Sequence, residues 1–431
     1  MATKQLGGRG VVCLFTGGTA AVVALITTGC AQTTWPQWGG PDRNFIVASG
    51  RLASTWPAEG PKRLWSRPLG DGYSTIVSDG ATLFTMYRKD KDDPSERVIA
   101  LDAATGATKW EHAYAAPYLC LDPNDEDKKQ TTQFGAGPNG TPVLVGGRLF
   151  TIGFTGKMCC LDVATGKEQW SHDLFKEYGA TMLVCGYASS PIAYRDTIIA
   201  LVGGKGHGLM AFDQATGKVV WQSGDMDCSY SSPVITTVNG EDHLVAYMAG
   251  EMIGASPKTG EIQWSLVHRN PTNANCICTP IACPNNRIYF VNGGDAAGGK
   301  MVRLEKKGGK IQPSEVWCNT KLTGGITDVV QIGDYFYGGN GRGFFVGFHA
   351  GTGQIAWQER GYPSARAVAA DGKLIVLDQD GRLTLVTATP GGLVQHGRAT
   401  LLEKEAWSAP TLIGTKLYLR DRKMIMGVEL G

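Results

Sequence analysis

A Thr-Gly turn followed four residues later by a tryptophan occurs five times in this chain of 431 residues. The copies are Leu101–Trp110, Leu161–Trp170, Phe212–Trp221, Ala255–Trp264 and Phe348–Trp357. Self-similarity at a period of roughly 40 to 50 residues is typical of propeller folds, and it constrains the architecture more than any local motif does. The sequence therefore predicts a ring of similar units.

Each copy of the pattern predicts a tight hairpin turn. Gly106 and its equivalents lie where such a turn needs a positive φ, and the preceding Asp and Thr can bond the turn's own backbone. Short alternating segments such as 148–152 and 287–291 follow Gly-Gly or Asn-Asn hairpin signals. We expect three or four short strands per unit. The tryptophan should begin the last strand and be buried between one sheet and the next.

Eight segments read as the first strand of a unit. They begin near Ser74, Gly140, Ser190, Ser232, Thr279, Thr327, Arg366 and Ser408, with an insertion near 118–139 in the first interval. The last unit ends at Gly431 without a tryptophan strand, whereas Lys62–Ser66 resembles such a strand with no unit before it. We predict an all-β, eight-bladed β-propeller of four-stranded antiparallel blades over 62–431, closed by this N-terminal strand.

The first 30 residues have the pattern of a signal peptide. Lys4 and Arg9 precede an apolar run, 11–26, that is too short for a comfortable membrane span. Thr27–Cys30 resembles a bacterial lipobox, although Leu is usual where Thr27 stands, and it predicts lipidation of Cys30. The alternative is cleavage after Ala31. Both predict an exported protein of the periplasm or outer membrane, touching the membrane only through an N-terminal lipid.

Residues 31–61 are polar and contain proline, and we expect them to form a tether lying on the propeller. The chain has 41 basic and 39 acidic residues, and removing the leader with Lys4 and Arg9 leaves 39 of each. A net charge near zero argues against a nucleic-acid partner.

The cysteine and histidine spacings predict no metal site. An odd number of cysteines follows the leader, so they cannot all pair within the chain: Cys120, Cys159, Cys160, Cys185, Cys228, Cys276, Cys278, Cys283 and Cys318. The run Cys276 to Cys283 lacks the paired spacing of zinc sites. The seven histidines fall in different units without ligand spacing. We expect most cysteines to be small buried residues.

The repeats, the segment Trp35–Asn44 and the Tyr230–Pro233 sequence resemble the PQQ-like (pyrroloquinoline quinone-like) β-propeller repeat family. The resemblance covers residues 35–431 and implies the fold. It leaves the function open, because the family includes quinoprotein alcohol dehydrogenases, exported propellers of unknown role, and the BamB lipoprotein of outer-membrane β-barrel assembly. The length, the lipobox and the eight units are BamB-like.

A dehydrogenase would hold quinone and calcium at the ring centre, with a vicinal disulfide over the quinone and an Asp base. Cys159 and Cys160 are adjacent, but they lie in a predicted strand, where neighbouring side chains point to opposite faces. We identify no Glu, Asn and Asp set for calcium. We therefore predict no cofactor and no catalytic residues, and keep a periplasmic PQQ-dependent alcohol dehydrogenase, with PQQ and calcium, as the alternative.

The loops that lead into the innermost strands should gather on one face around the central channel. Candidate partner-binding residues there are Tyr73, Asn139, Tyr187, Tyr230, Arg366 and Trp407. Tyr, Trp and Arg are common in binding hot spots, so these side chains would form a recognition funnel. The alternative is that they cap the blade interior. The sequence favours a monomeric, non-catalytic binding or assembly scaffold for an envelope protein or small ligand.

Overall fold

The structure of the protein is a computed structural model that describes residues 33–119, 130, 133–267, 276–291, 298–326, 328–403 and 405–431. The predicted signal peptide and lipidation site, Cys30, lie outside these residues. Within the described part of the chain, no helix is both long enough and apolar enough to cross a membrane.

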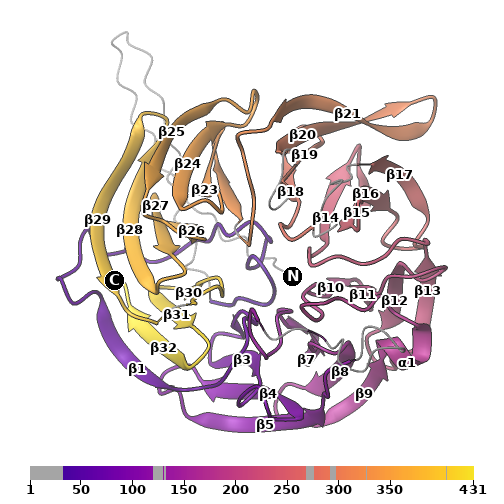
Figure 1. Cartoon of the computed structure of the whole chain (residues 1–431), viewed down its shortest axis with the longest axis horizontal. Helices are drawn as coiled ribbons and strands as arrows, with labels where there is room; N and C mark the ends of the chain where they lie inside the picture. The colour runs from indigo at the N-terminus through magenta and orange to yellow at the C-terminus, as the bar shows by residue number, and fades with distance from the viewer. Residues whose placement is uncertain are drawn as a thin grey trace, which may run out of the picture. The chain divides into compact units, whose positions relative to one another are not determined.

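Eight four-stranded antiparallel sheets form a ring around a central channel (Figure 1), so the predicted eight-bladed propeller is confirmed. Numbered from the first complete sheet, blades 1 to 4 run outward from the channel as follows: β2 (Val77–Ser78), β3 (Thr82–Tyr87), β4 (Ser95–Asp102), β5 (Thr108–Ala115); β6 (Val143–Val145), β7 (Arg148–Ile152), β8 (Lys157–Asp162), β9 (Glu168–Asp173); β10 (Ile192–Tyr194), β11 (Thr197–Leu201), β12 (Leu209–Asp213), β13 (Val219–Ser223); β14 (Val234–Val238), β15 (Glu241–Met248), β16 (Glu251–Ala255), β17 (Ile262–Val267).

Blades 5 to 8 have the same order: β18 (Ile281–Cys283), β19 (Arg287–Val291), β20 (Gly299–Lys307), β21 (Lys310–Asn319); β22 (Val329–Ile332), β23 (Tyr335–Gly339), β24 (Phe344–His349), β25 (Ile355–Arg360); β26 (Arg366–Ala370), β27 (Lys373–Leu377), β28 (Arg382–Thr389), β29 (Gly392–Thr400); β30 (Thr411–Ile413), β31 (Lys416–Arg420), β32 (Met424–Glu429), β1 (Lys62–Pro68). One five-residue helix, α1 (Leu174–Tyr178), follows β9 among the described residues.

The ring closes through blade 8, as the sequence predicted. Strand β1 pairs antiparallel with β32, from Lys62 opposite Glu429 to Pro68 opposite Met424. The buried guanidinium of Arg420 then links blade 8 to blade 1, donating to the carbonyl oxygens of Ser74 and Met86 at 3.2 and 2.6 Å. Because both chain ends share one sheet, blade 8 has its fourth strand and β32 is not left as an unpaired outer edge.

The Thr-Gly turn and the tryptophan are two halves of one contact between neighbouring blades. A Cβ atom on Gly166 would lie 2.5 Å from the Trp110 ring of the preceding blade, so only glycine fits there. The Trp110 Nε1 group donates to Val163 O at 2.8 Å. The same pairing joins Trp65 to Gly106, Trp170 to Gly217, Trp221 to Gly260 and Trp317 to Gly353.

Two details of the repeat differ from the prediction. The tryptophan is the third residue of its strand instead of the first, as Trp110 is in β5, because the turn is short and pairing already begins two residues before the tryptophan, at Thr108. Trp317 was missed because Gly308-Gly309, not Thr-Gly, precedes its strand. The predicted turn chemistry is confirmed: Asp102 Oδ1 accepts from the backbone N–H and hydroxyl of Thr105, at 3.0 and 2.8 Å.

The N-terminal segment crosses one end of the channel (Figure 1). Trp35 forms a bridge to Ser78 at the end of β2 and is fully buried. Farther along, Pro36 O accepts from Leu144 N of blade 2, and Val47 N donates to Ala369 O of blade 7. These partners lie within or at the C-terminal ends of innermost strands, so the segment covers the end toward which those strands run.

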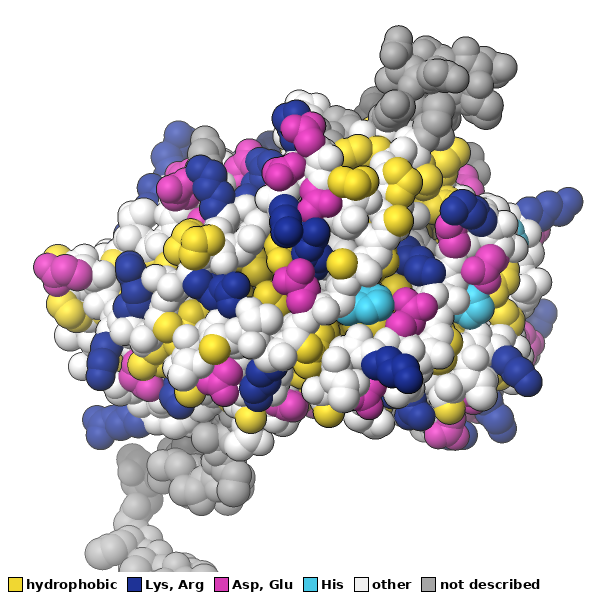
Figure 2. Space-filling view, turned by 90° about the horizontal axis from the view of Figure 1, so that it is seen from below, with side chains coloured by type: hydrophobic (Ala, Val, Ile, Leu, Met, Phe, Trp, Pro, Cys, Tyr) yellow, Lys and Arg dark blue, Asp and Glu magenta, His cyan; other side chains and the backbone are white. Residues whose placement is uncertain are grey.

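Charged side chains are mixed on the outside of the molecule. Figure 2 shows basic and acidic side chains interspersed over one side, with neither sign gathered into a patch. This distribution matches the near-balance of 41 basic and 39 acidic residues in the whole chain.

Candidate functional site

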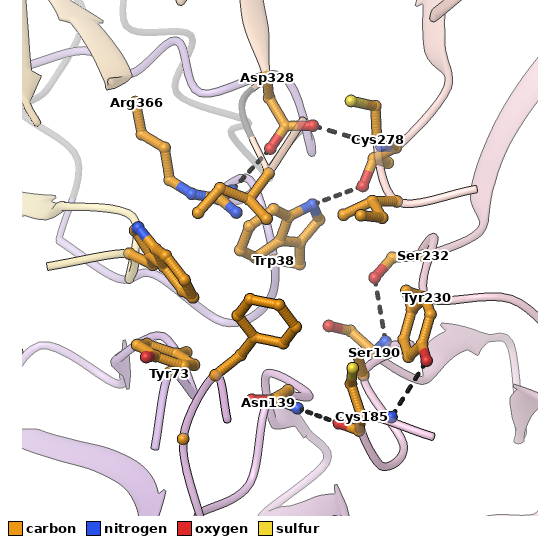
Figure 3. A pocket seen from close by; sticks show the side chains of 17 residues that line it. Trp38, Tyr73, Asn139, Cys185, Ser190, Tyr230, Ser232, Cys278, Asp328 and Arg366 are labelled. Carbon is orange, nitrogen blue, oxygen red and sulfur yellow. Dashed lines mark hydrogen bonds and ion pairs between the residues drawn. The ribbon is translucent and has the colours of Figure 1, made fainter. Parts of the chain in front are cut away.

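A cavity of about 340 Å³ lies at the channel end where the loops lead into the innermost strands (Figure 3). Every blade contributes to its lining, through Tyr73, Asn139, Ser190, Tyr230, Cys278, Asp328, Arg366 and Trp407. Trp38 of the N-terminal segment and Phe134 of the insertion between β5 and β6 complete it. The loops that lead into the innermost strands therefore meet around the channel, as predicted.

Five of the six candidate residues line this cavity: Tyr73, Asn139, Tyr230, Arg366 and Trp407. Tyr187 does not line it, which corrects the expectation for that residue. Its side chain is fully buried and packs edge-on against Phe175, with ring centroids 6.5 Å apart. Tyr187 stands one residue farther from its strand than the other aromatics do, and its ring turns into the interior between blades. Tyr187 therefore caps the blade interior, which is the alternative given above for these aromatic residues.

Aromatic rings form one wall of the cavity. The Tyr73 and Trp407 rings lie 4.9 Å apart, and Phe134, whose side chain is 47% exposed, lies 6.4 Å from Trp407. The Tyr73 hydroxyl donates to Glu405 Oε2 at 3.1 Å, and Trp407 Nε1 donates to Gln379 Oε1 at 3.3 Å. Burial raises the pKa of Tyr73, which keeps its hydroxyl protonated as a donor. These bonds fix the wall before any ligand arrives.

The facing wall is held by hydrogen bonds to Cys185. Its backbone N–H donates to the Tyr230 hydroxyl at 3.1 Å, and its carbonyl accepts from Asn139 Nδ2 at 3.0 Å (Figure 3). Burial raises the pKa of Tyr230. Tyr230 and Asn139 come from different blades, so Cys185 ties together three neighbouring loops.

A polar position just before the innermost strand links adjacent blades. Thr141 N donates to Ser190 Oγ, and Ser190 N donates to Ser232 Oγ, each at 3.0 Å. In blade 6 this position is Asp328, which accepts from Thr279 N at 3.3 Å. In blade 7 it is Arg366. Two neighbouring positions of a largely hydroxyl-lined ring thus carry opposite charges.

Asp328 and Arg366 form an ion pair with an N···O distance of 2.7 Å, and their side chains are only 10% and 13% exposed. Burial raises the pKa of Asp328 and lowers that of Arg366. The guanidinium lies 5.1 Å from the Trp38 ring centroid, and Trp38 Nε1 donates to Thr279 Oγ1 at 3.0 Å. Arg366 Nε is buried with no hydrogen-bond partner in the described part of the chain. Arg366 is thus a charged residue of the lining with one donor that the described protein leaves unpaired.

Sequence reasoning missed Asp328 and Trp38. Asp328 could have been found, because it lies as far before the end of its innermost strand as Thr141 and Ser190 lie before the ends of theirs. Trp38 had no comparable signal, since its contact with Thr279 joins residues 241 positions apart.

The cavity does not fit a calcium-bound quinone. Asp328 is the one carboxylate in the described lining, and it is already paired with Arg366. Cys159 packs in the cluster that includes blade 1, whereas Cys160 packs in the cluster that includes blade 3. Their predicted opposite orientation is confirmed, and neither lines the cavity. No catalytic step through such a cofactor follows from this geometry.

The sequence profile described as "Outer membrane protein assembly factor BamB" matches residues 94–359, which is more than half of the chain. The chain belongs to this family. The BamB from Moraxella catarrhalis has a similar structure at 16% identity and a TM-score of 0.56, covering 86% of this chain and 99% of that one.

The BamB-family fold is shared with quinoproteins. The quinohemoprotein alcohol dehydrogenase ADHIIG from Pseudomonas putida is 12% identical, with a TM-score of 0.53, and the match covers 93% of this chain and 80% of that one. An uncharacterized protein of Rickettsia prowazekii is 23% identical over an alignment 219 residues long that covers 39% of this chain. The match spans 51% of that relative's length. At these identities the structural matches establish the fold alone.

Proposed function

We propose that the protein is an exported, lipid-anchored, non-catalytic binding or assembly scaffold of the cell envelope. Membership of the BamB family supports a place in the envelope. The observation that carries the binding role is the cavity at the channel mouth, to which all eight blades contribute. Its ligand would be an envelope protein or a small ligand of the envelope.

Two properties suit this cavity to binding. Its volume of about 340 Å³ falls within the range of roughly 300–1,000 Å³ typical of ligand pockets, and its polar groups are few and fixed. Aromatic side chains and arginine supply most hot-spot energy in protein interfaces. Here Trp407 and Tyr73 are held in contact by their own hydrogen bonds, so little ordering entropy is lost when a ligand binds.

Replacing Tyr230 and Trp407 together with alanine should weaken partner binding by about 2 kcal/mol or more, roughly 30-fold in Kd. A photo-crosslinker at Phe134 in growing cells would first identify the partner, and interferometry with the purified partner would then give the affinities. Val394→Ala, on the outermost strand of blade 7 with a side chain 57% exposed, is the control and should bind normally.

Unchanged affinity in the folded Tyr230/Trp407 variant would reject the binding role of the cavity. Loss of the cooperative thermal transition in that variant would instead support the capping alternative. The thermal melt therefore accompanies every affinity measurement.

The fold likeness to a quinohemoprotein alcohol dehydrogenase motivates one alternative, a periplasmic PQQ-dependent dehydrogenase. It is tested by adding PQQ and calcium to the purified protein and recording absorbance and dye-linked alcohol oxidation. Stoichiometric quinone uptake with turnover would overturn the scaffold proposal. In that case Cys159→Ser and Cys160→Ser should reduce turnover if the vicinal pair serves the quinone, whereas a scaffold should keep its binding in both variants.

Lipid anchoring gives a separate prediction. Cys30→Ser should move the protein from the membrane fraction to the soluble fraction, since a multiply acylated terminus binds membranes far more firmly than a single chain does. Fractionation and mass spectrometry of the mature N-terminus are the measurements. A wild-type N-terminus at Gln32, with partitioning unchanged by the substitution, would favour the alternative cleavage after Ala31.

A further inference from the structure

A histidine, a cysteine and a glutamate from neighbouring blades meet away from the channel. His112 lies on β5 of blade 1, whereas Cys159 and Glu168 lie on β8 and β9 of blade 2. Their candidate ligand atoms are all within 4.8 Å of one another. Strands β5 and β9 are the outermost strands of neighbouring blades and follow one another around the rim of the ring (Figure 1). The sequence spacing gave no sign of this group, because two blades must pack to form it.

The distances within the group suit a small tetrahedral ion. His112 Nε2 and Glu168 Oε2 are 3.3 Å apart. Two N or O ligands bound to zinc at ~2.0–2.1 Å in a tetrahedron are roughly 3.3–3.4 Å from each other. His112 Nε2 is nevertheless buried without a hydrogen bond in the described structure, so the ring is aimed at Glu168 without satisfying its nitrogen. Beside them the Cys159 thiol is fully buried and free.

The next pair of blades provides an internal comparison. His172 stands two residues after Trp170, as His112 does after Trp110, but both of its ring nitrogens have partners. Nδ1 lies 2.6 Å from Glu177 Oε2, and Nε2 lies 2.8 Å from Gly217 O. By strand register, Met210 and Val219 replace Cys159 and Glu168 there. The unsatisfied histidine therefore occurs where the other two ligand types are also present.

Hydrogen bonds to its other oxygen atom orient the Glu168 carboxylate toward His112. Its Oε1 atom accepts from Ser171 Oγ at 2.6 Å, and that hydroxyl in turn accepts from Lys157 Nζ at 2.7 Å. These bonds leave Oε2 facing His112. Metal-binding carboxylates are commonly hydrogen-bonded in this way through the atom that does not bind the ion.

We propose that His112 Nε2, Cys159 Sγ and Glu168 Oε2 bind a zinc ion that joins blade 1 to blade 2. Nitrogen, thiolate and carboxylate oxygen are the ligand types that zinc takes, and the thiolate disfavours magnesium and calcium. Water is the fourth ligand, since His112 and Glu168 are 19% and 34% exposed. The site is independent of the proposed binding function at the channel mouth.

Cobalt(II) titration of the full chain, purified reduced and free of metal, tests this site. We expect one cobalt per chain, with a thiolate-to-cobalt charge-transfer band and the visible bands of tetrahedral cobalt, both lost on adding zinc. Cys159→Ser should remove the charge-transfer band, and Glu168→Gln should weaken zinc binding at least ~10-fold by calorimetry. Cys160→Ser is the matched control and should bind as the parent does, because this neighbouring thiol faces the other blade interface.

The proposal is overturned if the parent protein shows no saturable charge-transfer band, or if the band persists in Cys159→Ser. If Cys159→Ser fails to fold, zinc affinity is measured in His112→Gln and Glu168→Gln instead. Both of these side chains are partly exposed, so we expect the two variants to fold. Unchanged zinc affinity in both would also overturn it. Zinc should raise the melting temperature of the parent and leave that of Glu168→Gln nearly unchanged.

Discussion

Deleting the residues up to and including Ser66 is expected to abolish the cooperative thermal transition of the propeller. The deletion removes most of β1, which pairs with β32, and opens the ring at blade 8. It also removes five buried side chains, Trp35, Phe45, Val47, Leu52 and Trp56. Each contributes roughly 1.5–3 kcal/mol by burial. Together they rival the ~5–15 kcal/mol net stability of a typical domain.

Calorimetry and urea unfolding measure this effect. A chain that begins at Thr33 is the control, because it keeps all eight blades and the N-terminal segment, and it should melt as the parent does. A deletion variant with the parent's melting temperature would show that closure by β1 is not needed for stability.

Arg88→Met is expected to lower the free energy of unfolding by about 3–5 kcal/mol, because it leaves the Glu96 carboxylate buried and unpaired. Both side chains are fully buried and lie 3.2 Å apart. Arg88 also donates to Ala136 O at 2.7 Å, which holds the loop that carries Phe134 to the cavity. Chemical denaturation gives the stability change, and binding assays on the same variant would report displacement of that loop.

The control for Arg88→Met is the double variant that also carries Glu96→Gln, which should recover part of the loss because no charge is left buried. Lys91→Met should cost less than about 1 kcal/mol, since its ion pair with Asp92 is exposed. An Arg88→Met protein as stable as the parent would contradict the prediction that an unpaired Glu96 carboxylate destabilises the fold. A double variant no more stable than Arg88→Met would contradict it too.

The pH dependence of Arg88→Met has a definite sign. Burial raises the pKa of Glu96, and the charge of Arg88 opposes that rise. Removing Arg88 raises the folded-state pKa further, so the folded variant binds more protons than the folded parent over the acidic range. Its stability relative to the parent should therefore fall as pH rises from the folded-state pKa of Glu96 in the parent to the higher folded-state pKa in the variant. Urea unfolding at several pH values checks this.

Some features of the site were predictable because they depend on position within a repeat. Tyr73, Tyr230 and Trp407 precede equivalent strands, so aligning the units placed them at one mouth of the channel, and the structure puts all three in the cavity lining. The same alignment failed for Tyr187. A shift of one residue was enough to turn that side chain into the interior.

The eight units, the glycine turns and the closing strand could all be predicted from the amino-acid sequence. These depend on φ preferences, on the alternation of side chains along a strand and on turn chemistry, all of which act between residues close in sequence. The position of Trp38 against Arg366 and the approach of His112 to Cys159 could not be predicted in this way. Those contacts depend on how neighbouring blades pack and on the path of the N-terminal segment across the channel. Both are set by burial of side chains over the whole ring, which no local pattern records.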